Sequence, residues 1–239
     1  MKELEDYDWF PKILRQYQTD YIGSVVKWFN AYSPIIDYLN SQAFYAKTNW
    51  DLCSGSSEPA LSIFKKQNKF DKLILSDKYP HNFTINTNRI EYLNESIDVL
   101  ELNFKKENCY TMYNAFHHFN SREQVEIAKH VIDNESELII AEILEPTILN
   151  YIKIFFATTL GILLLSPFIK PFSLKRLFFS YLLPINILTI CYDGLVSVSK
   201  SKTVGEYQDI FSTLGNKVKI IKYKNLWSPV ILIHIKAIN

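Results

Sequence analysis

The sequence predicts an α/β fold with a mostly parallel sheet, an antiparallel C-terminal hairpin and an apolar helical insert. From Asn49 onward, short apolar runs alternate with helical spacing over about a hundred residues, which is the pattern of βαβ units. The C-terminal stretch VKIIKYKNLWSPVILIHIKAI contains two further apolar runs with a turn near Ser228–Pro229, as expected of an antiparallel edge hairpin. Between these parts, segment 147–204 contains two long runs without charge.

Composition excludes several classes of protein. A chain of 239 residues suits one large domain, and a net charge of +1 offers no basic surface for nucleic acid. The three cysteines lie far apart with no CxxC spacing, which indicates reduced thiols rather than a disulfide framework or a zinc site. The start, MKELEDYDWF, lacks the basic and apolar regions of a signal peptide. We expect a cytoplasmic protein with no metal site and no nucleic-acid partner.

The elements follow from apolar spacing. Helical periodicity within 8–47 predicts two or three helices. Apolar runs predict strands at Asn49–Leu52, Leu73–Ser76, Ile90–Leu93, Cys109–Phe116 and Leu138–Ile143, and helices at Glu58–Lys66 and Arg122–Ile132. We therefore divide the chain into N-terminal helices that cover the substrate (1–47), a core (48–146 and 205–239) and the apolar insert (147–204).

The insert contains the charge-free runs Ile154–Ile169 and Leu177–Tyr192, joined by the linker KPFSLKR. Each run is shorter than the roughly 20 residues that span a bilayer as a helix, and each contains a proline. If both spanned, the cationic linker would lie on the far side of the membrane, against the positive-inside tendency. A re-entrant or interfacial hairpin, or a lid, fits better. A pair of buried helices, at a dimer interface for example, is equally open.

The stretch DLCSGSSEPA is typical of a strand–loop–helix nucleotide site. Asp51 closes the first strand, Gly55 lies in the loop, and Asp77 follows 22 positions later at the end of the next strand. An acidic residue at about this distance commonly binds the ribose hydroxyls. Glu58 at the start of the next helix would repel a pyrophosphate, and G-x-G-x-x-G is missing, so an NAD-dependent enzyme is disfavoured. A sulfonium cofactor without phosphate suits this loop better.

The order of motifs carries a family resemblance. DLCSGSSEPA, LILSDKYP, SIDVLEL, TMYNAFHHF and IIAEILEP together resemble class I S-adenosylmethionine-dependent methyltransferases, most closely a bacterial branch distantly similar to the ubiquinone/menaquinone C-methyltransferases. The resemblance covers roughly residues 45 to 150, and CYDGLVSVSKSKTVGEYQDIF looks like the segment leading into that branch's last helix. It implies a Rossmann-like methyltransferase fold with a seven-stranded sheet, and S-adenosyl-L-methionine as cofactor.

The resemblance also implies which residues contact the cofactor. They are Asp51 with the loop residues Cys53, Ser54, Gly55 and Ser57 around the methionine moiety, Asp77 at the ribose hydroxyls with Lys78 beside it, Asp98 and Val99 flanking the adenine, and Asn114 at the cofactor floor. The family pattern has glycine at the positions of Cys53 and Ser57. This departure is expected to affect cofactor affinity.

Candidate catalytic residues follow the fourth strand. His117 and His118 emerge at the ligand-binding edge of the sheet, where an imidazole with a pKa near 6.5 can accept a proton from a phenol or hydroxyl. The alternative is that one of them only caps the strand, and the sequence does not choose between the two. Successive residues of an extended chain point in opposite directions.

Candidate substrate residues lie at the same edge. Tyr113 and Phe119 are expected to stack on a flat substrate or to pack in the core, and Glu142 to bind substrate or to form a structural ion pair. Asp193–Gly194 predicts a turn after the second apolar run. If the insert is a lid, Asp193 reaches the active site.

Two functions remain open. The first is a methyltransferase for a hydrophobic small-molecule or lipid-like acceptor, in contact with the inner face of the cytoplasmic membrane through 150–195. The second is a catalytically degenerate cofactor domain that serves as a membrane-associated binding or assembly subunit, suggested by the lost glycines. The acceptor atom (O, N or C) and a homodimer are left open.

Overall fold

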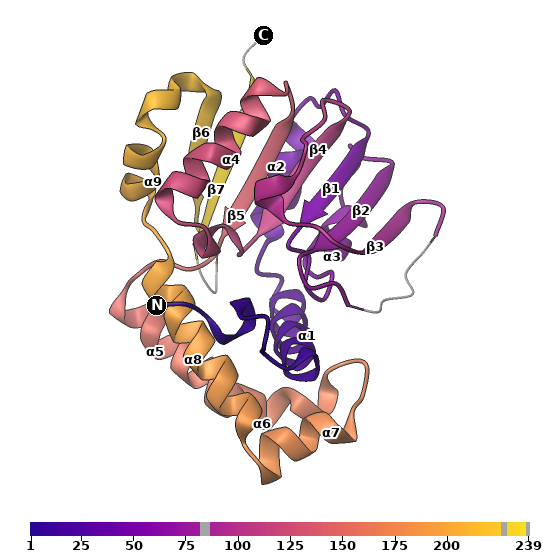
Figure 1. Ribbon diagram of the computed structural model, residues 1–239, viewed down its shortest axis with the longest axis vertical. Helices are drawn as coiled ribbons and strands as arrows, with labels where there is room; N and C mark the ends of the chain where they lie inside the picture. Colours follow the sequence, from indigo (N-terminus) through magenta and orange to yellow (C-terminus); the bar gives the residue numbers. More distant parts are fainter. Residues whose placement is uncertain (82–86, 226–228, 238–239) are drawn as a thin grey trace.

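The computed structural model describes residues 1–81, 87–225 and 229–237. Its centre is a seven-stranded sheet with the strand order β3-β2-β1-β4-β5-β7-β6 (Figure 1). The strands are β1 (Thr48–Leu52), β2 (Lys72–Asp77), β3 (Ile90–Ser96), β4 (Asn108–Tyr113), β5 (Glu137–Glu142), β6 (Val218–Tyr223) and β7 (Val230–Lys236).

Strands β1 to β5 are parallel, and β7 runs antiparallel between β5 and the edge strand β6. This confirms the predicted mostly parallel sheet with an antiparallel C-terminal hairpin. The predicted turn near Ser228–Pro229 includes Ser228, which lies outside the described residues. One strand is shorter than predicted. β4 ends at Tyr113 rather than at Phe116, because Asn114 adopts a φ of 50° and turns the chain.

The helices fall into two groups, those that pack on the sheet and those that extend from its edge. The α-helices are α1 (Lys12–Trp28), α2 (Ser33–Ser41), α3 (Ala60–Phe64), α4 (Ser121–Asp133), α5 (Ile148–Phe156), α6 (Ile162–Leu165), α7 (Leu174–Leu177), α8 (Ile185–Lys200) and α9 (Val204–Ile210). Short 3₁₀ or π segments are η1 (Leu4–Asp6), η2 (Val99–Glu101), η3 (Phe116–His118), η4 (Ala157–Gly161), η5 (Ser166–Phe168), η6 (Phe178–Leu182) and η7 (Ser212–Lys217).

Two apolar clusters cover the two faces of the sheet. On one face, α2 and α3 pack through Ile35, Leu39 and Ile63 against buried strand residues. On the other face, α4 and α9 pack through residues such as Ile127 and Tyr207. Helix α4 begins at a capping box formed by Asn120 and Glu123, which satisfies its first N–H groups. Helix α2 therefore belongs to the core, and the expectation that the N-terminal helices cover the substrate stays a prediction.

Segment α5–α8 forms a helical insert that extends away from the sheet (Figure 1). Its first helical stretch is continuous from Ile148 to Phe168, 21 residues, which is longer than the charge-free run suggested and long enough to cross a membrane. The second is a pair, Leu174–Leu182 and Ile185–Lys200, bent by 80°. The helix is longer than the charge-free run Ile154–Ile169 because its first turns, which contain Lys153, precede that run.

Asp193–Gly194 is not a turn but lies inside α8, so this prediction is wrong. The physical reason is the packing of α8 against α5. A Cβ atom at Gly194 would lie 2.7 Å from Ile154 Cγ2, so only glycine allows the two helices to approach this closely. Here the glycine serves a helix contact rather than a change of chain direction.

A buried ion pair joins the insert to α1. Arg176 is 2% exposed, and its Nη1 lies 3.2 Å from Asp20 Oδ2. Its Nη2 donates to the carbonyl oxygens of Ile169 and Pro171, each at 2.7 Å. The guanidinium therefore ties α7, the preceding linker and α1 into one unit.

Replacing Arg176 with methionine is expected to lower the free energy of unfolding by about 3 kcal/mol, because Asp20 is left as a buried charge without its partner. Urea unfolding followed by far-UV circular dichroism measures this. The double variant Asp20→Asn/Arg176→Met should recover much of the loss. Lys175→Met, at the exposed neighbouring position, should change stability by less than about 0.5 kcal/mol. Equal losses in Arg176→Met and Lys175→Met would contradict the anchoring role.

Candidate active site

A cavity of about 500 Å³ lies between the sheet edge, α1, the N-terminal segment and the insert. Most of the predicted site residues line it, from four separate stretches of chain. They are Cys53, Ser54, Gly55, Asp77, Lys78, Asp98, Val99, Tyr113, Asn114, His117, His118 and Phe119. Asp51, Ser57 and Glu142 are buried behind this lining.

The loop after β1 has the backbone of a glycine-rich turn without most of its glycines. Cys53, Gly55 and Ser57 have φ values of 55°, 47° and 71°. This left-handed region favours glycine, and other residues adopt it at a cost of roughly 1–2 kcal/mol. Ser54 N donates to Ser76 O at 2.9 Å and so ties the loop to β2. The positions where the family pattern has glycine are thus those where the backbone requires it.

Replacing Ser57 with glycine is expected to raise the free energy of unfolding by about 1 kcal/mol and to tighten binding of S-adenosylhomocysteine. Ser57 is fully buried at positive φ, and its hydroxyl has no hydrogen-bond partner among the described residues. Urea unfolding and calorimetry measure the two effects. Ser56→Gly is the matched control, because Ser56 does not have positive φ and should lose stability. A Ser57→Gly variant that behaves like Ser56→Gly would contradict this account.

Asp77 organises the loop and faces the cavity. Its Oδ2 accepts from Gly55 N and its Oδ1 from Tyr79 N, both at 2.8 Å. Burial raises the pKa of Asp77, while these two N–H groups and nearby histidines lower it again in part. A carboxylate at the end of β2 beside such a turn is the arrangement that binds vicinal ribose hydroxyls.

Lys78 and Asp98 form an ion pair of 2.7 Å at the same rim of the cavity. Asp98 also accepts from Leu100 N at 3.1 Å and so begins η2. The Asp98–Val99 segment is therefore fixed by its own hydrogen bonds, with the Val99 side chain buried. The predicted adenine-flanking pair lies on the cavity wall next to Asp77.

Asp51 does not reach the cavity. Its Oδ1 accepts from Thr111 Oγ1 at 2.8 Å, and burial raises its pKa to about 7. Asn114 lines the cavity after β4, where its N–H donates to Ala141 O at 2.8 Å. Asp51 thus supports the loop from behind the cavity lining, whereas Asn114 is itself part of that lining.

Glu58 is less repulsive than the sequence suggested. It forms a 2.7 Å ion pair with Lys27 of α1, and its Oε2 accepts from Ser62 N at 3.2 Å. Its charge is therefore compensated by α1. A pyrophosphate is therefore disfavoured by the non-glycine residues at the positive-φ loop positions more than by Glu58.

His117 and His118 lie in the short helix η3 and not in an extended strand. For this reason the two rings lie side by side, with centroids 4.7 Å apart, and both line the cavity. His117 Nδ1 lies 2.7 Å from Glu142 Oε2, and the other oxygen of Glu142 accepts from Phe116 N at 2.8 Å. Glu142 is 1% exposed with both oxygens engaged, which favours the second of its two expected roles, a buried pair that orients His117.

His118 is held by carboxylates of the N-terminal segment. Its Nδ1 lies 2.9 Å from Asp6 Oδ1, and its Nε2 lies 3.5 Å from Glu3 Oε2. Burial alone would lower the pKa of His118, but Glu3, Asp6 and Glu5 raise it to about 9. His118 therefore carries a proton at neutral pH and does not suit the role of a base. That role stays a prediction for His117.

The N-terminal segment contributes carboxyl groups to the site, which the expected substrate cover over 1–47 did not specify. The pKa of Glu5 is raised to about 8, mainly by burial and in part by neighbouring carboxylates, while the charge of His118 lowers it. Asp193, on α8, lines the cavity and accepts from Leu4 N at 2.6 Å and from Gln18 Nε2 at 2.9 Å. The acidic residues of MKELEDYDWF were a sequence signal for a role in the site. Nothing in this stretch, however, identifies the distant residues that these carboxyl groups contact in the fold.

The sheet order, the loop and the acidic strand end together define the fold of class I S-adenosylmethionine-dependent methyltransferases. The chain superposes on the O-methyltransferase NcsB1 from neocarzinostatin biosynthesis, solved with S-adenosylhomocysteine and 1,4-dihydroxy-2-naphthoic acid, with a TM-score of 0.52 at 9% identity over 91% of this chain and 56% of that one. The NcsB1 complex with S-adenosylmethionine and 2-hydroxy-5-methyl naphthoic acid gives 0.51 at 10% identity over 91% and 55%.

PigF with S-adenosylhomocysteine gives a TM-score of 0.47 at 16% identity, over 87% of this chain and 56% of that one. The chain thus spans about half the length of these solved proteins. No family model and no curated protein matches the sequence. The predicted Rossmann-like methyltransferase fold is confirmed.

Proposed function

We propose that the protein is an S-adenosylmethionine-dependent methyltransferase whose acceptor is a hydrophobic small molecule or lipid. One observation carries this proposal: a single cavity is lined both by the loop that fits the cofactor and by the apolar insert. Gly55 and Asp77 line one side, and Ile154, Thr158 and Ile190 line the other. The finer resemblance to the bacterial ubiquinone/menaquinone C-methyltransferase branch belongs to the same proposal and rests on the sequence motifs.

The residues present fit the cofactor. The loop backbone and Asp77 would hold its methionine and ribose parts, and Asp98 and Val99 would lie beside the adenine. When bound, the cofactor supplies an electrophilic methyl group on a sulfonium. The protein's contribution is to hold an electron-rich acceptor atom in line with that methyl group and to exclude water, and this positioning provides most of the rate enhancement. Support for the cofactor comes from the fold that NcsB1 shares, which is solved with S-adenosylmethionine.

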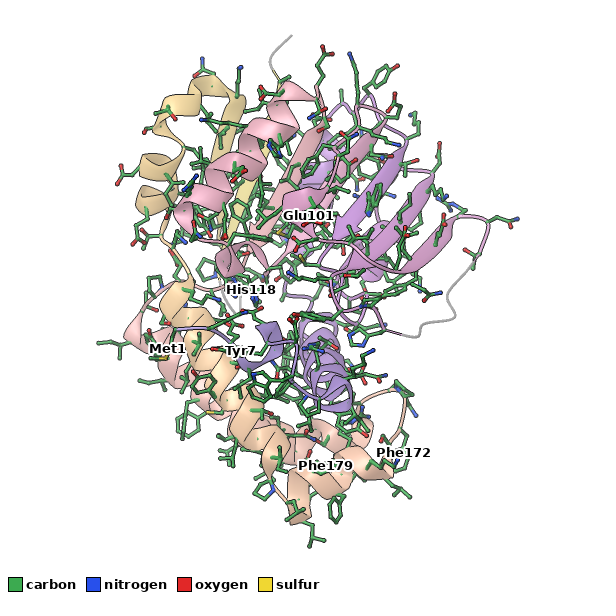
Figure 2. The ribbon with its side chains drawn as sticks, viewed as in Figure 1. Met1, Tyr7, Glu101, His118, Phe172 and Phe179 are labelled. Carbon is green, nitrogen blue, oxygen red and sulfur yellow. The ribbon has the colours of Figure 1, made fainter. Side chains whose placement is uncertain are left out.

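The insert supports a hydrophobic acceptor. Large apolar side chains are exposed along the whole of it, and only 17% of the most apolar window of Ile148–Phe168 is buried. In Figure 2, Phe172 and Phe179 lie at the end of the insert far from the sheet, while His118 lies between sheet and insert. The most exposed members are Ile148 (81%), Leu149 (59%), Leu160 (53%), Leu164 (70%), Phe168 (66%), Phe172 (56%), Leu174 (74%), Leu182 (71%) and Leu188 (67%).

An apolar surface of this extent on a protein in water marks an interaction site, and we assign it to a lipid bilayer. The exposed Lys170 and Lys175 near the tip disfavour deep insertion, because a lysine at the bilayer centre costs about 2.5–3.5 kcal/mol. The insert therefore lies along the interface, with its lysines among the headgroups. In this arrangement the protein is a peripheral protein of the inner face of the cytoplasmic membrane, and the acceptor enters the cavity from the bilayer.

Calorimetry with S-adenosylhomocysteine tests the first half of this proposal, and we expect binding of one molecule per chain. Transfer of a labelled methyl group from S-adenosylmethionine into a membrane lipid extract tests the second half, with the label expected in the organic phase. No binding at millimolar cofactor would exclude the methyltransferase. Binding without transfer to any component of lipid extracts would favour the alternative, a degenerate binding or assembly subunit.

A further inference from the structure

Three side chains with metal-ligating atoms meet at the floor of the cavity. Glu3, His117 and His118 each offer one ligand atom, and these atoms lie within 4.8 Å of one another. Glu3 and His117 are 1% and 2% exposed, and all three residues line the cavity. We call this set the Glu–His–His cluster.

Both histidines of the cluster are oriented by a second carboxylate. The Nδ1 of His117 lies 2.7 Å from Glu142, and the Nδ1 of His118 lies 2.9 Å from Asp6. The Nε2 atoms are thereby turned toward Glu3, at 4.0 Å and 3.5 Å from its two oxygens. Histidines that ligate metals commonly donate their other ring N–H to a carboxylate, which sets the tautomer and raises the basicity of the ligating nitrogen.

One polar atom of the cluster is left over. His117 Nε2 is buried and has no hydrogen-bond partner among the described residues. Leaving a buried polar atom unpaired costs about 1–3 kcal/mol, so such atoms in folded proteins call for an explanation. With Nδ1 held by Glu142, Nε2 presents a lone pair to the cavity.

Charge around the cluster favours a cation. Carboxyl groups of Glu3, Asp6, Glu142 and Asp193 lie in or directly behind the cavity wall. Lys200 compensates part of this charge through Glu3 and Asp6, at 3.1 Å and 3.5 Å. The hydroxyl of Ser197 donates to Glu3 Oε2 at 2.9 Å and holds that carboxylate in place.

We propose that the Glu–His–His cluster binds one divalent transition-metal ion, of which Zn²⁺ is the representative, through Glu3, His117 Nε2 and His118 Nε2. Because only the neutral imidazole ligates a metal, the proton that His118 carries at neutral pH leaves to solvent when the ion binds. Two imidazole nitrogens and one carboxylate suit Zn²⁺, Co²⁺ and Fe²⁺ rather than Mg²⁺ or Ca²⁺. Two ligands each about 2.1 Å from a tetrahedral ion lie about 3.4 Å apart. The ligand atoms of the cluster lie within 4.8 Å of one another, so the most distant pair must close in by at most about 1.4 Å. Three protein ligands leave at least one position open toward the cavity.

The open coordination position defines a role for the ion in activating the acceptor. This part of the inference rests on the proposed methyltransferase function. An acceptor hydroxyl bound to the ion has a lowered pKa and a fixed direction, so it is presented as an oxyanion near the sulfonium methyl. The proton leaves to solvent or to buffer, and no redox step is involved.

Metal binding is tested on the full-length chain without a histidine tag, after dialysis against a chelator. Zn²⁺ titrated in a calorimeter at neutral pH should bind at one ion per chain, and Co²⁺ should give an absorption spectrum of nitrogen and oxygen ligands without a thiolate band. His117→Gln and Glu3→Gln should each weaken Zn²⁺ binding at least about 100-fold, since even the loss of an outer-shell partner costs 10–100-fold. Circular dichroism checks that the variants are folded.

His130→Gln is the matched control. His130 lies on α4 and does not line the cavity, so this variant should bind Zn²⁺ like the wild type. The inference is overturned if the wild type binds Zn²⁺ no more tightly than His117→Gln, or if a thiolate band assigns the ion to Cys53. Binding of S-adenosylhomocysteine is measured in the same samples. If the protein binds Zn²⁺ but not S-adenosylhomocysteine, the methyltransferase proposal fails and the metal site stands. If it binds S-adenosylhomocysteine but not Zn²⁺, the metal site fails and the methyltransferase proposal stands.

Discussion

Replacing Asp77 with alanine is expected to weaken binding of S-adenosylhomocysteine by at least about 100-fold. Two hydrogen bonds from ribose hydroxyls to a carboxylate contribute roughly 1.5–3 kcal/mol each, and a factor of ten in affinity corresponds to about 1.4 kcal/mol. The substitution also removes the acceptor for Gly55 N, on which the shape of the loop depends. Both losses act on the same ligand, so this is the largest effect of a single substitution that we expect.

Asp71→Ala is the matched control for this experiment. Asp71 is an exposed aspartate that immediately precedes β2, at the end of the strand opposite Asp77. Calorimetry should show unchanged cofactor affinity in Asp71→Ala, and circular dichroism should show that both variants are folded. A folded Asp77→Ala protein with the affinity of the wild type would place the cofactor somewhere else.

The double variant Leu160→Glu/Leu164→Glu is expected to reduce binding to vesicles of phosphatidylcholine and phosphatidylglycerol by at least about 100-fold. Burial of a leucine side chain contributes about 1.5–3 kcal/mol, so two leucines contribute about 3–6 kcal/mol before any cost of placing charge in lipid. Both residues are exposed, at 53% and 70%, so the substitution should leave the fold intact. Co-sedimentation with vesicles measures the binding.

Tyr45→Glu is the control for a general effect of added negative charge. Tyr45 is 77% exposed and lies between α2 and β1, outside the insert. It should bind vesicles nearly as well as the wild type. A wild-type protein that ignores vesicles and forms a dimer in solution would instead assign the apolar face to a second copy of the chain. If the wild type ignores vesicles and stays monomeric, the membrane proposal fails as well.

Much of the core could be predicted because its signals are local. A run such as Leu73–Ser76, followed directly by Asp77, already contains the buried strand and the carboxylate at its end. The loop could be predicted for the same reason, since Asp51, Gly55 and Asp77 have the spacing of a nucleotide site. The backbone strain of the loop could not be predicted, because the φ values at Cys53 and Ser57 depend on how the loop is held against β2.

The roles of two residues depend on contact between distant parts of the chain. Asp193–Gly194 has the composition of a turn, yet its glycine is required by a neighbouring helix about 40 residues away in sequence. Glu142 is at the right edge of the sheet for substrate, but His117 occupies one oxygen and the Phe116 N–H the other. In each case the residue type suited a predicted role, but a contact with a partner elsewhere in the fold gave the residue a different role.

The sequence by itself determined the sheet, the cofactor-type loop and the apolar character of the insert, because periodicity and residue type act over a few neighbours. Only the tertiary structure decided that Glu3 and Asp6 meet His118, more than a hundred positions away. Only the tertiary structure, too, placed the insert against the same cavity as the loop. Buried charges must find partners wherever the fold brings them, and no local pattern encodes which partner that will be.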